Sequence, residues 1–193
     1  TEEQKKTLET FLKRGVVQGS PTPDPVHDTQ RYRKVKNRYI RAVHWSVTGR
    51  CNLKCRHCYM NAPDYKYRDL SLEECRALAD QFYEAGVVQV SVTGGEPFVR
   101  RDIFELMDYI LARGMGISQI YTNGLLVTPE ILAWFEKRSL KPQFVLSYDC
   151  VTYHDYMRGV KNVEKPTLRV MRLLAEHGFP VIVETVLCND NIH

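Results

Sequence analysis

From residue 40 onward the chain alternates short β-branched runs with longer amphipathic stretches, and this rhythm restricts the fold more than any other feature. Five strands are expected, at residues 40–48, 87–93, 117–122, 143–149 and 180–187. Their spacing of roughly 30 residues is what a strand, a helix and a parallel strand require. We therefore predict an α/β fold of parallel strands wound as an open or closed barrel, with a doubly wound sheet as the alternative.

Four helices are expected between or beside these strands. They begin near Ser71, Asp102, Thr128 and Pro166. Ser71 and Glu74 have the S-x-x-E spacing of a capping box, and Gly86 is a suitable end for that helix. Pro129 suits the first turn of the third helix because the N–H that proline lacks has no partner there.

The first 38 residues differ in character from the rest. Leu8, Phe11 and Leu12 recur at helical spacing, which predicts a short helix within the first fifteen residues. Residues 16–38 contain three prolines and suit an irregular arm. The stretch 31–41 holds six basic residues and no acid, within a chain of net charge +4. We predict two parts, an N-terminal helix with a basic arm (1–38) and an α/β core (39–193).

Polar and apolar side chains alternate along the expected strands. Val88, Val90 and Val92 alternate with polar residues, and 42–48 shows the same pattern. Because the helices need an apolar face to cover, the polar face is expected to line a lumen wide enough for a cofactor or substrate. An ordinary half-exposed sheet is the alternative.

Three of the six cysteines crowd into CNLKCRHCY, at Cys51, Cys55 and Cys58. Clustered thiolates select zinc, copper(I) or iron–sulfur centres. Structural zinc needs a fourth ligand, and His57 is poorly placed because adjacent side chains diverge. Three thiolates suit a cubane cluster with one open iron. The other three cysteines are expected to be small buried residues: Cys75, Cys150 and Cys188.

The spacing C-x-x-x-C-x-x-C resembles the signature of radical S-adenosylmethionine (SAM) enzymes, with His57 where an aromatic residue usually stands. The resemblance continues through GGEP (94–97), YTNG (121–124), SYD (147–149) and HDYMRG (154–159). Each of the first three motifs follows or ends an expected strand, where parallel α/β folds collect binding groups. The resemblance covers residues 40–193 and implies a partial (β/α)6 TIM-like barrel.

The resemblance implies two cofactors and a set of residues that contact them. Cys51, Cys55 and Cys58 would hold a 4Fe-4S cluster, whose electron cleaves SAM to a 5′-deoxyadenosyl radical that abstracts hydrogen from a substrate. The residues implied to contact SAM are Tyr59 near adenine, Gly94, Gly95 and Glu96 near the amino group, and Ser147 and Arg158 near the carboxylate or ribose. Arg169 is an alternative to Arg158, and Thr122 and Asp149 are expected to face the lumen. No catalytic side chain is assigned.

The motifs resemble the N-terminal catalytic part of SPASM and twitch members, many of which modify peptides. A peptide or protein substrate is preferred, with another small molecule or tetrapyrrole and heme biosynthesis as alternatives. A zinc-thiolate module that binds nucleic acid is the alternative from another class. We expect a flavodoxin or ferredoxin electron donor, no nucleic-acid or membrane partner and a cytoplasmic location. The family core usually has six units, so the chain is expected to be a fragment lacking the last unit and any auxiliary-cluster domain.

Overall fold

The computed structural model describes residues 2–18, 40–64, 66, 68–189, 191 and 192. Its contacts divide the chain into two compact units, Thr1–Asn37 and Arg38–His193. The first contains helix α1 (Glu2–Lys13), which has no buried residue and carries its apolar side chains exposed. Most of the predicted basic arm falls on residues 19–39 and lies outside the described residues.

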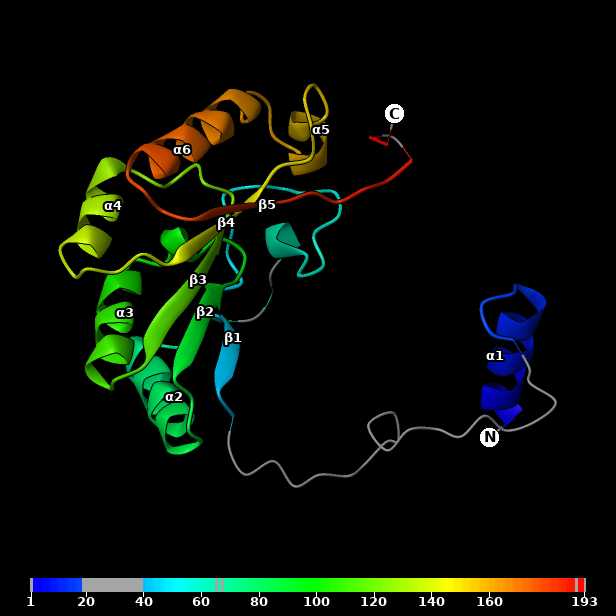
Figure 1. Ribbon diagram of the computed structural model, residues 1–193, viewed down its shortest axis with the longest axis horizontal. Helices are drawn as coiled ribbons and strands as arrows, with labels where there is room; N and C mark the ends of the chain where they lie inside the picture. The colour runs from blue at the N-terminus through cyan, green and yellow to red at the C-terminus, as the bar shows by residue number, and fades with distance from the viewer. Residues whose placement is uncertain (1, 19–39, 65, 67, 190, 193) are drawn as a thin grey trace. The chain divides into compact units, whose positions relative to one another are not determined.

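The second unit is built on one sheet of five parallel strands whose order in space is their order in sequence (Figure 1). The strands are β1 (Ala42–Ser46), β2 (Gln89–Thr93), β3 (Gly116–Thr122), β4 (Gln143–Ser147) and β5 (Val181–Glu184). A doubly wound sheet would reverse the strand order at a switch point. The sequential order therefore confirms a partial barrel wound in one direction and excludes the doubly wound alternative.

Helices lie between successive strands along the chain, and each predicted one is present. They are α2 (Leu72–Glu84), α3 (Ile103–Ala112), α4 (Pro129–Glu136) and α6 (Glu164–Glu176). The capping box is confirmed, because Glu74 N donates to Ser71 Oγ at 3.2 Å and Ser71 N donates to Glu74 Oε2 at 2.8 Å. None of the described helices is long and apolar enough to cross a membrane.

Three short helical elements were not predicted. They are η2 (Ala62–Asp64), η3 (Pro97–Val99) and α5 (His154–Arg158). Elements of three to five residues span fewer than two helical turns, so hydrophobic periodicity does not reveal them. α5 nevertheless proves central to the site described below.

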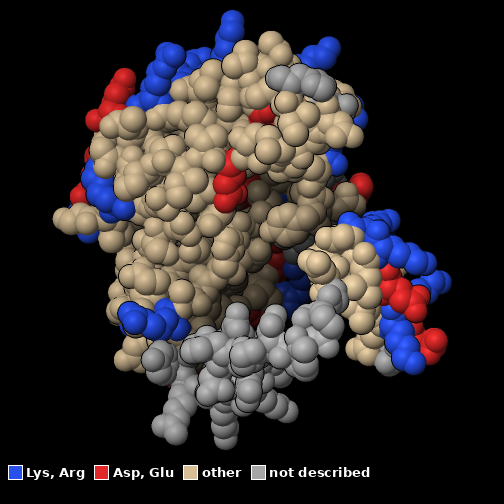
Figure 2. Space-filling model, turned by 45° about the vertical axis from the view of Figure 1, so that its right-hand side comes forward, with Lys and Arg blue, Asp and Glu red and all other residues tan. Residues whose placement is uncertain are grey.

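The alternation along the strands separates the core from the polar face as predicted, except at Val88, which is exposed because β2 begins one residue later, at Gln89. Trp45, Val92 and Phe144 are buried in the hydrophobic cluster that joins the sheet to the helices. On the other face, Gln119 Nε2 donates to Gln143 Oε1 at 2.9 Å, in a polar network that spans adjacent strands. On the core unit, Figure 2 shows Lys and Arg side chains mainly at the edges of the face it views. The sheet thus has one dry face and one polar face.

The three scattered cysteines differ in burial. Cys75 is buried, as expected, but Cys150 and Cys188 are only partly buried, so the prediction for these two is wrong. Both lie in irregular segments beyond strand ends, outside the hydrophobic cluster between the sheet and the helices. Cys150 also has φ 112°, a backbone conformation that favours glycine.

Replacing Cys150 by glycine is expected to stabilise the protein by about 1 kcal/mol, because glycine removes the steric cost of a positive φ. Urea unfolding of the apoprotein measures the change. Cys188→Gly is the matched control, since Cys188 does not have a positive φ, and it should be neutral or destabilising. A Cys150→Gly variant no more stable than the control variant would contradict the strain argument.

Candidate functional site

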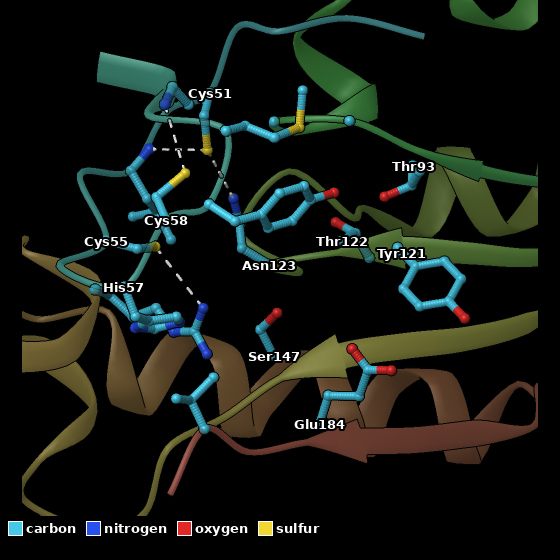
Figure 3. A pocket seen from close by; sticks show the side chains of 18 of the residues that line it. Cys51, Cys55, His57, Cys58, Thr93, Tyr121, Thr122, Asn123, Ser147 and Glu184 are labelled. Carbon is cyan, nitrogen blue, oxygen red and sulfur yellow. Dashed lines mark hydrogen bonds between the residues drawn. The ribbon is translucent and has the colours of Figure 1, made fainter. Parts of the chain in front are cut away.

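A cavity of about 470 Å³ lies at the carboxyl ends of the strands (Figure 3). Its volume is within the range of cofactor and ligand sites. Predicted site residues that line it are Cys51, Cys55, Cys58, Tyr59, Gly94, Gly95, Thr122, Ser147 and Arg158. Segments from β1 to β5 therefore contribute to one composite cavity, although their residues are far apart in the sequence.

The cysteine-containing loop (51–58) is held at its start by a carboxylate that sequence reasoning did not identify. Asp69 Oδ2 accepts a hydrogen bond from Thr48 Oγ1 at 2.8 Å, and Asp69 Oδ1 accepts one from Gly49 N at 3.1 Å. Arg50 Nε lies 3.4 Å from Asp69 Oδ2. A lone acidic residue in a loop carries no sequence signal, so only the tertiary contacts reveal this anchor.

Helix α5 holds the middle of the same loop. Lys54 N donates to Arg158 O at 3.1 Å, and Arg56 N donates to Met157 O at 2.9 Å. Gly159 ends α5 with φ 67°, and a Cβ at this position would overlap the carbonyl oxygen of Lys54. The cysteine-containing loop therefore depends on a close backbone approach by a segment about 100 residues later.

Gly94 and Gly95 allow the end of β2 to approach the loop from the other side. Gly95 N donates to Thr48 O at 2.9 Å, and Glu96 N donates to Arg50 O at 2.8 Å. A Cβ at Gly94 would overlap the carbonyl oxygen of Thr48, and a Cβ at Gly95 would overlap that of Arg50. The packing thus requires both glycines, and their contact with SAM stays a prediction.

Each of the three cysteine sulfur atoms lies near an N–H group. The donors are Leu53 N toward Cys51 Sγ (3.4 Å), Ala62 N toward Cys58 Sγ (3.4 Å), Arg158 Nη1 toward Cys55 Sγ (3.7 Å) and Asn123 Nδ2 toward Cys51 Sγ (3.9 Å). Hydrogen bonds of this kind stabilise thiolates that ligate iron and help to set the potential of a cluster. The donor set therefore fits an iron–sulfur cluster.

The thiols are partly buried, which affects their ionisation. Burial raises the pKa of Cys51 to about 11. Burial also raises the pKa of Cys55, although the nearby Arg158 guanidinium opposes this effect. Metal binding must displace these thiol protons. Within the described residues, no three His, Cys, Asp or Glu side chains are grouped to hold a single metal ion. A cluster spreads its thiolates over separate iron atoms, so the arrangement does not need to converge on one point.

Arg158 is fixed by a buried polar cluster behind the cavity. Its Nε lies 2.8 Å from Asp149 Oδ2 as an ion pair, without the alignment of a hydrogen bond. Asp149 N donates to His154 Nδ1 at 3.3 Å, and His154 Nε2 lies 3.3 Å from Thr167 Oγ1. The guanidinium is thereby aimed at Cys55 Sγ. Its predicted contact with SAM stays a prediction.

Two expectations about side chains in this region are wrong, one for Asp149 and one for Arg169. Asp149 is fully buried under Arg158 and does not line the cavity, so it does not face the lumen. Arg169 lines a different cavity, beside α6, and does not take the place of Arg158. The sequence placed both residues near the correct strand or helix, but their side-chain directions depend on the packing of α5 and α6.

Glu96 is turned into the interior and does not line the cavity. Its carboxylate accepts hydrogen bonds from Thr122 Oγ1 (2.9 Å), Asn123 N (2.9 Å) and Phe98 N (3.2 Å). It therefore joins the ends of β2 and β3, while its contact with the SAM ammonium stays a prediction. Unlike Glu96, Tyr59 lines the cavity and is 86% exposed. Its contact with adenine stays a prediction.

Burial raises the pKa of Glu96 from 4.5 to about 7, against the opposing effect of its hydrogen-bond donors. Between these two pH values the unfolded chain ionises this group and the folded protein resists ionisation. The free energy of unfolding should therefore fall as pH rises through this window, by up to about 3 kcal/mol relative to Glu96→Gln, which does not ionise. Chemical unfolding of the apoproteins from pH 4 to 8 measures the difference.

Glu84→Gln is the control for this experiment, because Glu84 is exposed at the end of α2. Its pH profile should run parallel to that of the wild type. A Glu96→Gln profile that also runs parallel to the wild type would show that Glu96 titrates alike in both states.

Comparison with known proteins gives concordant results. The Radical SAM superfamily model matches residues 45–193. The antilisterial bacteriocin subtilosin biosynthesis protein AlbA of Bacillus subtilis is 32% identical over 150 residues, which are 77% of this chain and 33% of AlbA. The AdoMet-dependent heme synthase of Oleidesulfovibrio alaskensis is 32% identical over 156 residues, which are 79% of this chain and 39% of the synthase.

A solved structure supports the fold. Streptococcus suis SuiB bound to precursor peptide SuiA has a TM-score of 0.64 at 17% identity, covering 98% of this chain and 47% of SuiB. The chain spans about a third to two fifths of the length of the two curated relatives above. The family match runs from within β1 to the last residue and includes all three clustered cysteines. The chain belongs to the radical SAM superfamily.

Proposed function

We propose that this chain is the cluster- and SAM-binding part of a radical SAM enzyme that modifies a peptide or protein. Family membership implies a 4Fe-4S cluster and SAM as cofactors. When bound, these cofactors supply the reductive cleavage of SAM and the hydrogen abstraction that follows. The observation that carries the proposal is the convergence of three cysteine thiols and the strand-end motifs on one cavity.

The chain's own residues hold and shield the reacting groups in this proposal. Cys51, Cys55 and Cys58 ligate the cluster, and the N–H donors around them stabilise the thiolates. Gly94 and Gly95 leave the cavity edge open to SAM, and Ser147 offers it a hydroxyl. An electron donor such as flavodoxin or ferredoxin and a cytoplasmic location belong to the same proposal.

The charge of the cavity lining supports a peptide over a tetrapyrrole, while the relatives include enzymes named for both kinds of product. AlbA is named for the biosynthesis of a bacteriocin, whereas the heme synthase is equally similar in sequence. A tetrapyrrole carries carboxylates that need cations. Among the described lining residues, Arg158 is the one Lys or Arg, and Asp149 already neutralises it. Neutral polar lining residues such as Thr93 and Asn123, in contrast, offer hydrogen-bonding groups that suit a peptide backbone.

Anaerobic purification tests the cofactors first. The protein should be brown, contain about four iron and four sulfide per chain, and give a reduced-cluster EPR signal that changes when SAM is added. Addition of dithionite and SAM should yield 5′-deoxyadenosine. Colourless protein with one zinc per chain would instead support the zinc-thiolate alternative.

A mass-shift assay on a panel of peptides and porphyrins tests the substrate class, using the full-length enzyme. A change in peptide mass that requires SAM and reductant is the expected result. Conversion of a porphyrin, with no peptide modified, would transfer the assignment to tetrapyrrole biosynthesis.

A further inference from the structure

The end of the cavity away from the cysteine-containing loop is formed by His44 of β1, Tyr121 of β3 and Glu184 of β5. Figure 3 shows Tyr121 and Glu184 on the opposite side of the cavity from the cysteines. Glu184 is paired in register with Ser147, which lines the cavity. Paired residues on neighbouring strands face the same side of a sheet, so the strand register directs Glu184 into the cavity.

Tyr121 is held in place by contacts on two sides. Its ring centroid lies 4.5 Å from that of His44. Its hydroxyl donates to Gln119 Oε1 at 3.2 Å, and Gln119 is itself fixed by Gln143 at 2.9 Å. Burial and the nearby Glu184 carboxylate raise the pKa of Tyr121, so the phenol stays neutral at physiological pH. The aromatic pair is therefore a rigid wall, and its Tyr121 hydroxyl is neutral and already engaged.

Glu184 gives this end of the cavity an uncompensated negative charge. Within the described residues, no hydrogen bond or ion pair engages its carboxylate. Arg158, the one Lys or Arg among the described lining residues, is paired with Asp149. A carboxylate beside aromatic rings attracts a cation through both the charge and the ring quadrupole. The same charge repels carboxylates such as those of a tetrapyrrole.

We propose that His44, Tyr121 and Glu184 form a subsite for the ammonium or guanidinium group of a lysine or arginine side chain in the substrate. This inference rests on the proposed peptide-modifying function and names a charge preference for it. The flat aromatic wall packs against the aliphatic stem of the side chain, and Glu184 pairs with its charged end. Glu184 is a specificity-determining residue in this arrangement, and it takes no part in the chemical step.

Peptide binding to the anaerobic, cluster-loaded chain in the presence of SAM tests the subsite. The probes are four capped pentapeptides that differ only in the central residue, which is lysine, arginine, norleucine or glutamate. Isothermal titration calorimetry should show the lysine and arginine peptides binding about fivefold more tightly than the norleucine peptide, the range expected for a partly solvated ion pair. The glutamate peptide should bind most weakly.

Variants of Glu184 test whether this carboxylate causes the preference for lysine and arginine peptides. Glu184→Gln should remove the difference between the lysine and norleucine peptides, and Glu184→Lys should reverse the order so that the glutamate peptide is preferred. Glu84→Gln, which removes an exposed carboxylate from α2, should keep the wild-type order. Raised salt should reduce the wild-type preference, because the ion pair is partly exposed.

Three outcomes would overturn the subsite. They are equal binding of the four peptides to the wild type, absence of binding by the lysine peptide, and a lysine preference that persists in Glu184→Gln. If Glu184→Gln weakens SAM binding but keeps the peptide preference, the carboxylate belongs to the SAM site and the proposal fails. Failure of the proposed function is separate, since it appears as wild-type protein that forms no 5′-deoxyadenosine from SAM.

Discussion

Replacing Cys55 by alanine is expected to abolish cluster assembly and to lower 5′-deoxyadenosine formation by at least about a hundredfold. The physical reason is the ligand count, since the described loop offers three thiols and two do not hold a cubane cluster firmly. The fold should persist, because the backbone of the loop is held by Asp69 and α5 through contacts that do not involve this sulfur. Iron and sulfide analysis, EPR and circular dichroism measure these effects.

Cys188→Ala is the matched control for that experiment. Cys188 is a partly buried cysteine that does not line the cavity, so its loss should leave iron content and SAM cleavage unchanged. If Cys55→Ala keeps four iron per chain, or if Cys188→Ala loses them, the assignment of the ligands is wrong.

Replacing Gly95 by alanine is expected to disrupt the site without removing any ligand. A Cβ at Gly95 would overlap the carbonyl oxygen of Arg50 and lie 2.7 Å from the carbonyl carbon, immediately before Cys51. Backbone atoms cannot rotate away as a side chain can, so the loop must shift. We expect a loss of about 3 kcal/mol in the free energy of unfolding of the apoprotein and a large loss of bound iron.

Gly114→Ala separates close packing from backbone strain. Gly114 has φ 82°, but a Cβ there would meet no atom within 4 Å. This control should cost about 1 to 2 kcal/mol and keep the wild-type iron content. A Gly95→Ala protein with normal iron content and stability would show that the end of β2 and the cysteine-containing loop do not need their close approach.

The strands and long helices were predictable because their patterns are local. The capping box at Ser71 and the apolar face that includes Val90 and Val92 depend on residues a few positions apart. Element ends were less predictable, since β4 stops at Ser147 where a longer strand was expected. Cys150, with its positive φ, lies just beyond that end, and no local pattern predicts a positive φ at a cysteine.

The site was only partly predictable, because the residues that hold its motifs in place lie far from them in the sequence. The motifs identified the residues that line the cavity, but not the residues that hold those motifs in place. Asp69 anchors the start of the loop and α5 anchors its middle, although one is a lone acid and the other a five-residue helix. The Glu96 carboxylate lies in the interior, where three donors bind it, and no local pattern predicts this set of partners.

The sequence by itself determined the class of fold, the family resemblance and the three thiols, because periodicity and ligand spacing are properties of neighbouring residues. Only the tertiary structure decided which polar groups meet across the sheet. Arg158 reaches Cys55, Asn123 reaches Cys51 and Glu184 faces the same cavity, because the register of five parallel strands brings their carboxyl ends together. Such contacts between distant segments depend on packing and strand register, which no local pattern contains.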